Sequence, residues 1–149
     1  MSNKKEALTL EIKNAENFHG HLGPFLVIGV KMARLAKKIL NVDRNKLWDL
    51  QVVAELPLIT PYSCILDGIQ ATTQCTVGNR KLEVRSSDES VVAIFKLKSQ
   101  NKTLKIHVNK QMIEMLKEQL SKGASNEDLA WKIADMPENQ LFNIENGKF

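Results

Sequence analysis

Cysteine is scarce in this sequence. Only Cys64 and Cys75 occur among 149 residues, which is too few for the disulfide scaffold of a small secreted protein. Their separation is not Cys-x-x-Cys, so the chain lacks the motif of a zinc ribbon or a thioredoxin. In a reducing compartment both cysteines would be free thiols or metal ligands. A single domain of this length needs neither disulfide nor metal to fold, because it buries roughly two thirds of its unfolded surface.

Aromatic residues and long apolar runs are scarce as well. Aromatics make up 5% of the chain, the lysines are dispersed and the formal charge is only +4, whereas nucleic-acid binding usually needs a dense basic face with aromatics. No segment approaches the ~20 apolar residues of a membrane span, and the polar start does not lead into a signal peptide. We therefore expect a cytoplasmic protein that binds no nucleic acid and no membrane.

The length of the chain is typical of a single domain, and hydrophobic periodicity predicts several helices together with an antiparallel β-meander. The core spans about residues 10–136 and a C-terminal tail follows at 137–149. Helical spacing of apolar residues occurs at 5–17, 24–39, 61–73, 110–121 and 125–136. Strand patterns occur at 50–58 and, as a predicted antiparallel meander, at 82–85, 91–98 and 103–108. The tail is expected to dock on the body or on a partner through Phe142, Ile144 and Phe149.

The segment Phe18-His19-Gly20-His21-Leu22-Gly23-Pro24 concentrates reactive side chains ahead of a long apolar helix. Gly20 lets the two imidazoles approach one point, because glycine accepts backbone angles closed to other residues. Pro24 suits the first turn of a helix, where its missing N–H is not needed. A bare His-x-His step is as consistent with one capping and one half-exposed histidine as with a ligand pair. Within the helix, Gly29 predicts the close approach of another backbone.

A second segment repeats this design ahead of another helix. Thr60 and Pro61 resemble an N-cap and a first helical residue, which would place Ser63 and Cys64 in the first turn. The helix N-terminus would then lower the pKa of the Cys64 thiol and favour the thiolate. Asp67, one turn later, could orient a ligating histidine or bind a metal itself.

A thiolate and two neutral imidazoles suit Zn²⁺ or a similar transition ion and leave a fourth coordination position for water or substrate. The predicted metal ligands are therefore His19, His21 and Cys64. Cys75 is the alternative sulfur ligand, although a cysteine at a turn is more often a small buried thiol. The third histidine, His107, alternates with apolar residues of a predicted strand and is interpreted as a surface or sheet histidine.

Three sequence blocks, in order, resemble the FmdE family, which takes its name from a component of formylmethanofuran dehydrogenase. The blocks are Phe18-His19-Gly20-His21-x-Gly23-Pro24, Ser63-Cys64-x-x-Asp67-Gly68-Ile69-Gln70 and Gln74-Cys75-Thr76-x-Gly78-Asn79. The resemblance covers roughly residues 10–110. It implies an α+β fold in a single domain, with several helices packed on an antiparallel sheet. It also implies a homodimer, and a cleft where the histidine loop meets the cysteine-bearing helix and can bind a metal ion. The cleft residues expected besides the ligands are Phe18, Gly20, Gly23, Pro24 and Ser63.

The sequence departs from the family pattern in two places. Many members have a cysteine directly before the proline, where this chain has Gly23. Thiol chemistry that needs that cysteine is therefore in doubt here. Many members also carry a C-terminal zinc ribbon, for which this chain has too few cysteines.

The leading hypothesis is an FmdE-like protein with a divalent transition metal, zinc first, or a small ligand at the histidine and cysteine site. Its link to formylmethanofuran or one-carbon metabolism is implied by the family name only. The alternative is a non-catalytic accessory subunit that acts as a homodimer or with formylmethanofuran dehydrogenase subunits. Thiol redox chemistry at Cys64 is a third hypothesis. No general base is visibly paired with a nucleophile, so the catalytic residues and the substrate stay undefined.

Overall fold

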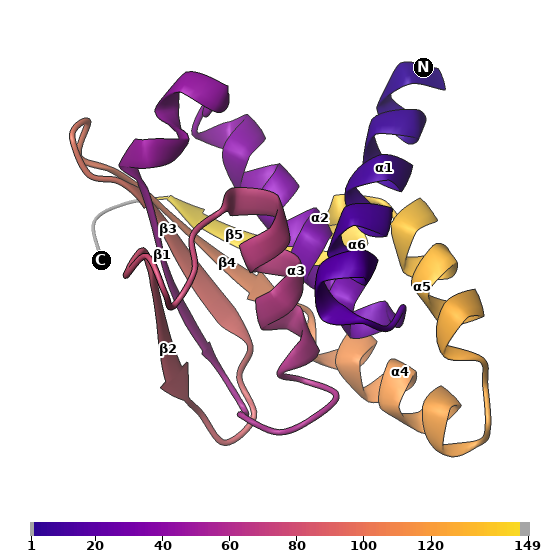
Figure 1. Ribbon diagram of the computed structural model, residues 1–149. Coiled ribbons are helices and arrows are strands. Elements are labelled where there is room, and N and C mark those ends of the chain that lie inside the picture. The colour runs from indigo at the N-terminus through magenta and orange to yellow at the C-terminus, as the bar shows by residue number, and fades with distance from the viewer. Residues whose placement is uncertain (1, 147–149) are drawn as a thin grey trace.

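Seven helices and a five-stranded sheet make up residues 2–146, the part of the chain that the computed structural model describes (Figure 1). The helices are α1 (Ser2–His19), α2 (Pro24–Ile39), a 3₁₀ helix η1 (Arg44–Asp49), α3 (Cys64–Thr73), α4 (Lys110–Ser121), α5 (Asn126–Asp135) and α6 (Glu138–Leu141). The strands are β1 (Leu50–Leu56), β2 (Leu82–Ser86), β3 (Val92–Leu97), β4 (Lys102–Val108) and β5 (Phe142–Asn146). The predicted α+β class is confirmed, and α2 and α4 have the predicted bounds.

The sheet is mixed, with the strand order β2-β1-β3-β4-β5. β1 pairs in parallel with β2, where Val52 lies opposite Leu82, and the other three pairings are antiparallel. The predicted meander is therefore correct for β3 and β4 but wrong for β2, which lies on the far side of β1. The reason is the crossover through α3, which lets β1 and β2 run in the same direction. Strand periodicity alone does not specify the pairing partner.

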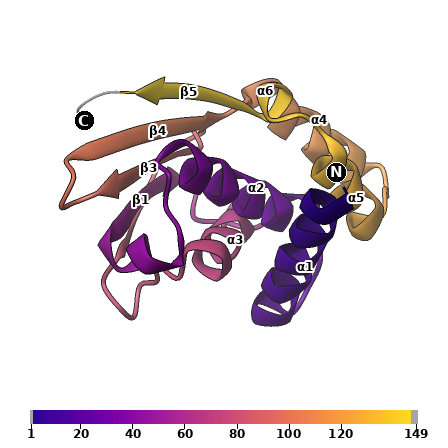
Figure 2. The same ribbon diagram turned by 90° about the horizontal axis from the view of Figure 1, so that it is seen from above.

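One face of the sheet is covered by α2 and α3, and α1 and α5 pack on the outer side of these two helices (Figure 2). Alternate residues of β1 are buried toward the helices: Leu50, Val52, Ala54 and Leu56. Full burial of a large aliphatic side chain contributes roughly 1.5–3 kcal/mol. Between residues 2 and 146, no helix covers the opposite face of the sheet (Figure 2). In the same range, no helix combines the length and the apolar character that crossing a membrane requires.

Two glycines bring α2 and α3 into backbone contact. A Cβ on Gly29 would lie 2.2 Å from the Ile65 carbonyl oxygen, and one on Gly68 would lie 2.3 Å from the Leu26 carbonyl oxygen. Neither position accepts a side chain unless the helices separate. The close approach predicted at Gly29 is thus confirmed. Because both glycines lie within about two turns of their helix starts, the contact fixes the starts of α2 and α3 side by side.

Lys31 fixes α5 on α2. Its side chain is buried, and Nζ donates to three carbonyl oxygens at the end of α5, those of Ile133, Ala134 and Met136. A cation is favoured there by the helix dipole, although burial lowers the pKa of Lys31. At the other end of the pair, Gly23 before α2 meets Asn126 at the start of α5. The two helices therefore run in the same direction, and their starts coincide.

α3 begins at Cys64, later than the sequence predicts. The Thr60–Pro61 peptide bond is cis, and residues 60–63 form turns rather than helix. Ser63, not Thr60, is the N-cap residue, and its side chain makes no capping hydrogen bond among the described residues. The Thr-Pro pair precedes the helix as expected, but the chain turns once more before the helix starts.

The segment after Pro137, expected as a tail, adds α6 and a fifth strand. β5 pairs with β4 in antiparallel fashion, with Phe142 opposite Val108. Phe142 is buried, as predicted for a residue that docks on the body, whereas Ile144 is 42% exposed. Phe149 lies outside the described residues. The sheet therefore includes residues that the sequence pattern assigns to no element.

Candidate functional site

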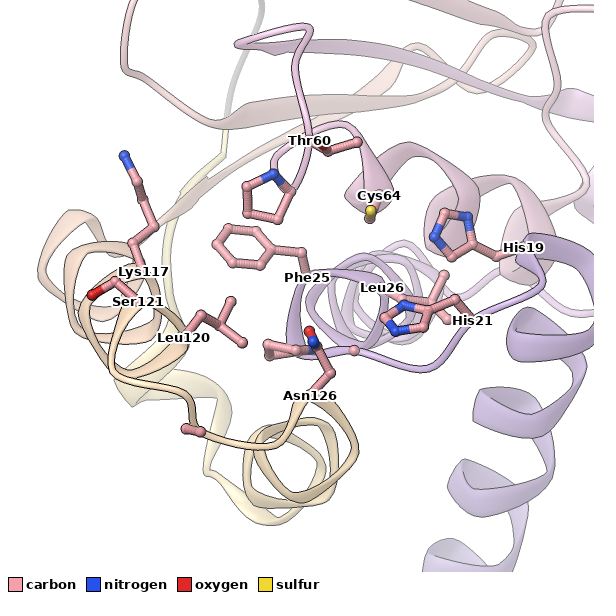
Figure 3. Close-up of a pocket in the computed structure, with 14 residues that line it drawn as sticks. His19, His21, Phe25, Leu26, Thr60, Cys64, Lys117, Leu120, Ser121 and Asn126 are labelled. Atoms are coloured by element: carbon pink, nitrogen blue, oxygen red, sulfur yellow. The ribbon is translucent and has the colours of Figure 1, made fainter.

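Three helices begin around one pocket of about 670 Å³ (Figure 3). α2, α3 and α5 all start at its wall, α1 reaches it with its last residue, and α4 lines it with its final turns. The predicted site residues in its lining are His19, His21, Gly23, Pro24 and Cys64. A concave site of this size, largely apolar with a few polar groups, is typical of small-molecule binding.

His19, His21 and Cys64 form one end of the pocket (Figure 3). His19 is the last residue of α1, and its Nδ1 lies 2.6 Å from Oδ2 of Asp67 on α3. This is the contact expected if Asp67 orients a histidine, and it leaves Nε2 as the nitrogen available to a ligand. The ring centres of His19 and His21 are 6.5 Å apart.

Cys64 lines the pocket, but its thiol is not activated. Burial raises the pKa of Cys64, the negative charge of Asp67 raises it further, and a backbone hydrogen bond opposes them only in part. The predicted bias toward thiolate is therefore wrong. The influence of the helix N-terminus is outweighed because the sulfur is partly desolvated beside a carboxylate. This removes the basis for thiol redox chemistry at Cys64.

The histidine end does not form a metal site with its side chains as they stand. Two imidazole nitrogens bound to one Zn²⁺ at about 2 Å in tetrahedral geometry would place their ring centres roughly 5 Å apart. The rings of His19 and His21 are farther apart than this. Within residues 2–146, no group of three or more His, Cys, Asp or Glu side chains is arranged to hold a metal ion. The zinc site stays a prediction, and it requires the imidazoles to move closer together.

The centre of the pocket is apolar, and its opposite end carries a lysine. Phe25 and Leu120 lie between the two ends, Leu26 lies beside His21, and Lys117 lies at the end away from the histidines (Figure 3). The Phe25 ring meets the Tyr62 ring edge-on, with 5.8 Å between the ring centres. Lys117 Nζ donates to the Tyr62 hydroxyl at 2.9 Å and lies 4.9 Å from the ring centre. The hydrogen bond to Tyr62 raises the pKa of Lys117, which is therefore a cation at neutral pH.

α2 starts at the pocket wall, and its first residue, Pro24, has no N–H of its own. Among the described residues, no side chain caps this helix, which follows Gly23. By contrast, the Ser125 hydroxyl accepts from the Asp128 N–H at the start of α5, and turn hydrogen bonds occupy the first N–H groups of α3. Uncapped N–H groups with the helix dipole behind them favour an anion or another acceptor atom.

Five other predicted site residues do not line the pocket. Among the described residues, the lining omits Phe18, Gly20 and Ser63, and Phe18 is 57% exposed. Asp67 contributes through its contact with His19. Cys75 is fully buried, as expected of a small buried thiol, and its Sγ donates to the Leu50 carbonyl oxygen at 3.2 Å.

His107 lies away from this pocket, on β4. Its Nε2 is 3.3 Å from Oε2 of Glu145 on β5, and its side chain is 37% exposed. Its interpretation as a sheet histidine near the surface is confirmed.

Sequence reasoning does not find Lys117 or Asn126, which come from helices far along the chain. A weak signal for Asn126 exists at Gly23, where a Cβ would lie 3.1 Å from the Asn126 Oδ1 and 3.4 Å from the His21 Cε1. A glycine here leaves room for the asparagine. Lys117 has no comparable signal, because its local sequence pattern is that of an ordinary lysine on the polar face of a helix.

Comparison with known proteins places the pocket within a family match. The family model described as "FmdE, Molybdenum formylmethanofuran dehydrogenase operon" matches residues 18–143. A protein of Archaeoglobus fulgidus named "Probable S-adenosyl-L-methionine-binding protein" is 26% identical over 166 residues. This similarity covers 97% of the present chain and 44% of the relative, so the chain spans less than half the length of that protein. All the pocket residues, from His19 to Asn126, lie inside the family match.

Proposed function

The chain belongs to the FmdE family, and from that premise we propose that its pocket binds a small organic ligand with an apolar body and an anionic end. One observation carries the proposal: the uncapped start of α2 and the cationic Lys117 line the same pocket, whose centre is apolar. N–H groups at a helix start donate to an acceptor atom. The lysine attracts the anionic group, and the apolar centre buries the body of the ligand.

S-adenosyl-L-methionine is the first compound to test. The Archaeoglobus relative carries this compound in its name, and the similarity to it covers nearly the whole of the present chain. In the arrangement we propose, the adenosine lies over Phe25 and Leu26, and an adenine nitrogen accepts from the start of α2. The carboxylate of the methionine part then reaches Lys117.

Isothermal titration calorimetry with S-adenosyl-L-methionine and S-adenosyl-L-homocysteine tests the proposal. We expect Lys117→Ala to weaken binding about tenfold, because it removes a charge-assisted contact. Lys122→Ala is the matched control, since Lys122 directly follows α4, pairs with Glu118 at 2.9 Å and is not part of the pocket lining. Failure of both compounds to bind, or equal binding by both variants, would overturn the proposal.

A second proposal is that the pocket binds a divalent transition metal. Zinc is the first candidate, and the ligands would be His19, His21 and Cys64. The hydrogen bond between His19 and Asp67 favours it, because metal-binding histidines commonly donate their second N–H to a carboxylate. Metal analysis of freshly purified protein, with His21→Ala as the comparison, provides the test. Wild-type protein that carries no more metal than the variant would count against a site.

We also propose the expected homodimer. A role beside formylmethanofuran dehydrogenase subunits, or in one-carbon metabolism, is a further proposal. Leu10 and Phe18 support an interaction surface on α1, because they are 62% and 57% exposed and lie eight residues apart on one helix face. Light scattering after size exclusion tests the dimer. A monomeric mass at micromolar concentration would contradict it.

A further inference from the structure

A second pocket of about 360 Å³ lies beside the first. It is formed by the turn before α3, the loop between β2 and β3, the end of β4 and the first two turns of α4. Lys117 lines both pockets. Tyr62 lines the second, while its ring packs against Phe25 of the first. The two pockets therefore meet at the Tyr62–Lys117 pair.

The second pocket carries charges of both signs. Glu89 and Lys110 form an ion pair in its wall, with 3.1 Å between Oε2 and Nζ. Glu114 and Lys117 lie three residues apart on α4, so their side chains are neighbours. Between residues 2 and 146, Glu114 forms no ion pair of its own. In that range, the charge of Glu114 acts on both Lys110 and Lys117 without a direct ion pair. A carboxylate in no direct ion pair beside an ammonium group can receive a zwitterion, one charge on each.

The contact between Tyr62 and Lys117, which separates the two pockets, can break with little loss of stability. The hydrogen bond from Lys117 to Tyr62 lies at the surface, and exposed contacts between flexible side chains stabilise a protein only weakly. A ligand carboxylate can therefore replace the Tyr62 hydroxyl as the acceptor for Lys117. A ligand that does so from the first pocket brings its neighbouring atoms to the mouth of the second.

We propose that the second pocket receives the α-amino acid end of the ligand whose body occupies the first. Lys117 binds the carboxylate of that end, and Glu114 accepts hydrogen bonds from its ammonium group. The proposal rests on the proposed function of the first pocket. The proposal makes Glu114 a specificity residue. A ligand without an ammonium group at this end has nothing to donate to the Glu114 carboxylate and gains no affinity from it.

Two probes that share an adenosyl body test this assignment by calorimetry. S-adenosyl-L-methionine carries the amino acid end, and 5′-methylthioadenosine lacks it. We expect Glu114→Gln to weaken binding of S-adenosyl-L-methionine about tenfold and to change binding of 5′-methylthioadenosine less than about twofold. Glu118→Gln is the matched control, because Glu118 lies one turn further along α4 and outside both pocket linings. Thermal denaturation verifies that both variants fold.

The outcomes separate this proposal from the one on which it rests. If Glu114→Gln weakens both probes equally, or leaves both unchanged, the second pocket does not receive the amino acid end. The proposed function, which the Lys117→Ala comparison tests, then still holds. If wild-type protein binds both probes equally tightly, the contact between Lys117 and the carboxylate is absent, and both proposals fail. If neither probe binds wild-type protein, both proposals fail.

Discussion

The two ends of the main pocket are built in different ways. At the histidine end, backbone contact between α2 and α3 at Gly29 and Gly68 fixes the helix starts that carry the site residues. At the lysine end, Lys117 and Tyr62 meet through side chains at the surface. The first end therefore has a geometry set by the fold, whereas the second can adapt to what binds. Under the proposed function, the histidine end would position the ligand and the lysine end would select it.

The strongest way to break this contrast is to force the two helices apart. We expect Gly68→Ala to lower the free energy of unfolding by about 3 kcal/mol, because the new Cβ would overlap the Leu26 carbonyl oxygen. Urea unfolding measures the change. Gly78→Ala is the matched control, since its Cβ would meet only the Thr76 hydroxyl at an ordinary 3.8 Å. A loss below about 0.5 kcal/mol for Gly68→Ala would show that the helix contact is not rigid.

The next largest expected effect is an increase in zinc affinity at the histidine end of the pocket. Gly23→Cys adds a thiol beside His21, whose Cε1 would lie 3.4 Å from the new Cβ. We expect zinc affinity to rise at least about tenfold, because a third or fourth good ligand joins the set. Competition with a chromogenic chelator measures it. Gly23→Ala adds the same Cβ, with the same crowding of Asn126 and His21, but no sulfur, so it should not raise zinc affinity. An equal response of both variants would contradict the prediction.

The protonation of Cys64 gives a smaller effect at the same end. Burial and then Asp67 raise the pKa of Cys64 above its ordinary 9.0, so the thiolate fraction is low at neutral pH and grows only as the pH rises beyond that value. In chelator-treated protein, the iodoacetamide rate at Cys64 should therefore be half-maximal above pH 9.0. Mass spectrometry follows the reaction, with buried Cys75 as the unreactive internal control.

Asp67→Asn sharpens the same measurement. The substitution removes the second cause of the raised pKa and leaves burial in place. The alkylation midpoint should therefore move down without falling to that of a free thiol. A wild-type midpoint below pH 9.0 would restore the thiolate interpretation that the structure contradicts.

The smallest effect is expected at the adaptable end. Tyr62→Phe removes the acceptor for Lys117 but keeps the ring that packs on Phe25. The midpoint of thermal unfolding should shift by less than about 2 °C, because the lost hydrogen bond is exposed to solvent. Differential scanning calorimetry measures this, and Tyr62→Ala, which also removes the ring, should shift it more. A large shift for Tyr62→Phe would mean that both ends are equally fixed.

The histidine end could largely be predicted from the sequence because its parts lie next to helix starts. Pro24 marks one start, and His19, His21 and Asp67 sit at fixed spacings from the two starts. The thiol state of Cys64 could not be predicted this way, because it depends on burial and on a carboxylate that only the fold brings close. Local pattern predicts position along a helix, but not the desolvation that shifts a pKa.

The lysine end and two of the strands could not be predicted for a different reason. Lys117 has the same local pattern as any solvent-facing lysine, so its place at the pocket comes from tertiary packing alone. β5 contains mainly polar residues after Phe142, as suits an edge strand with one face in solvent. The parallel pairing of β2 depends on the crossover through α3, which strand periodicity does not reveal.

The late position of β5 has a consequence for how the protein is made. β4 pairs with β3 on one side and with β5 on the other, and the β5 residues are Phe142–Asn146. While the ribosome has not yet released these residues, β4 is an unpaired edge strand that another nascent chain could extend. The sheet is therefore completed only after synthesis of the helices around the pocket, and co-translational protection of that edge would favour correct folding.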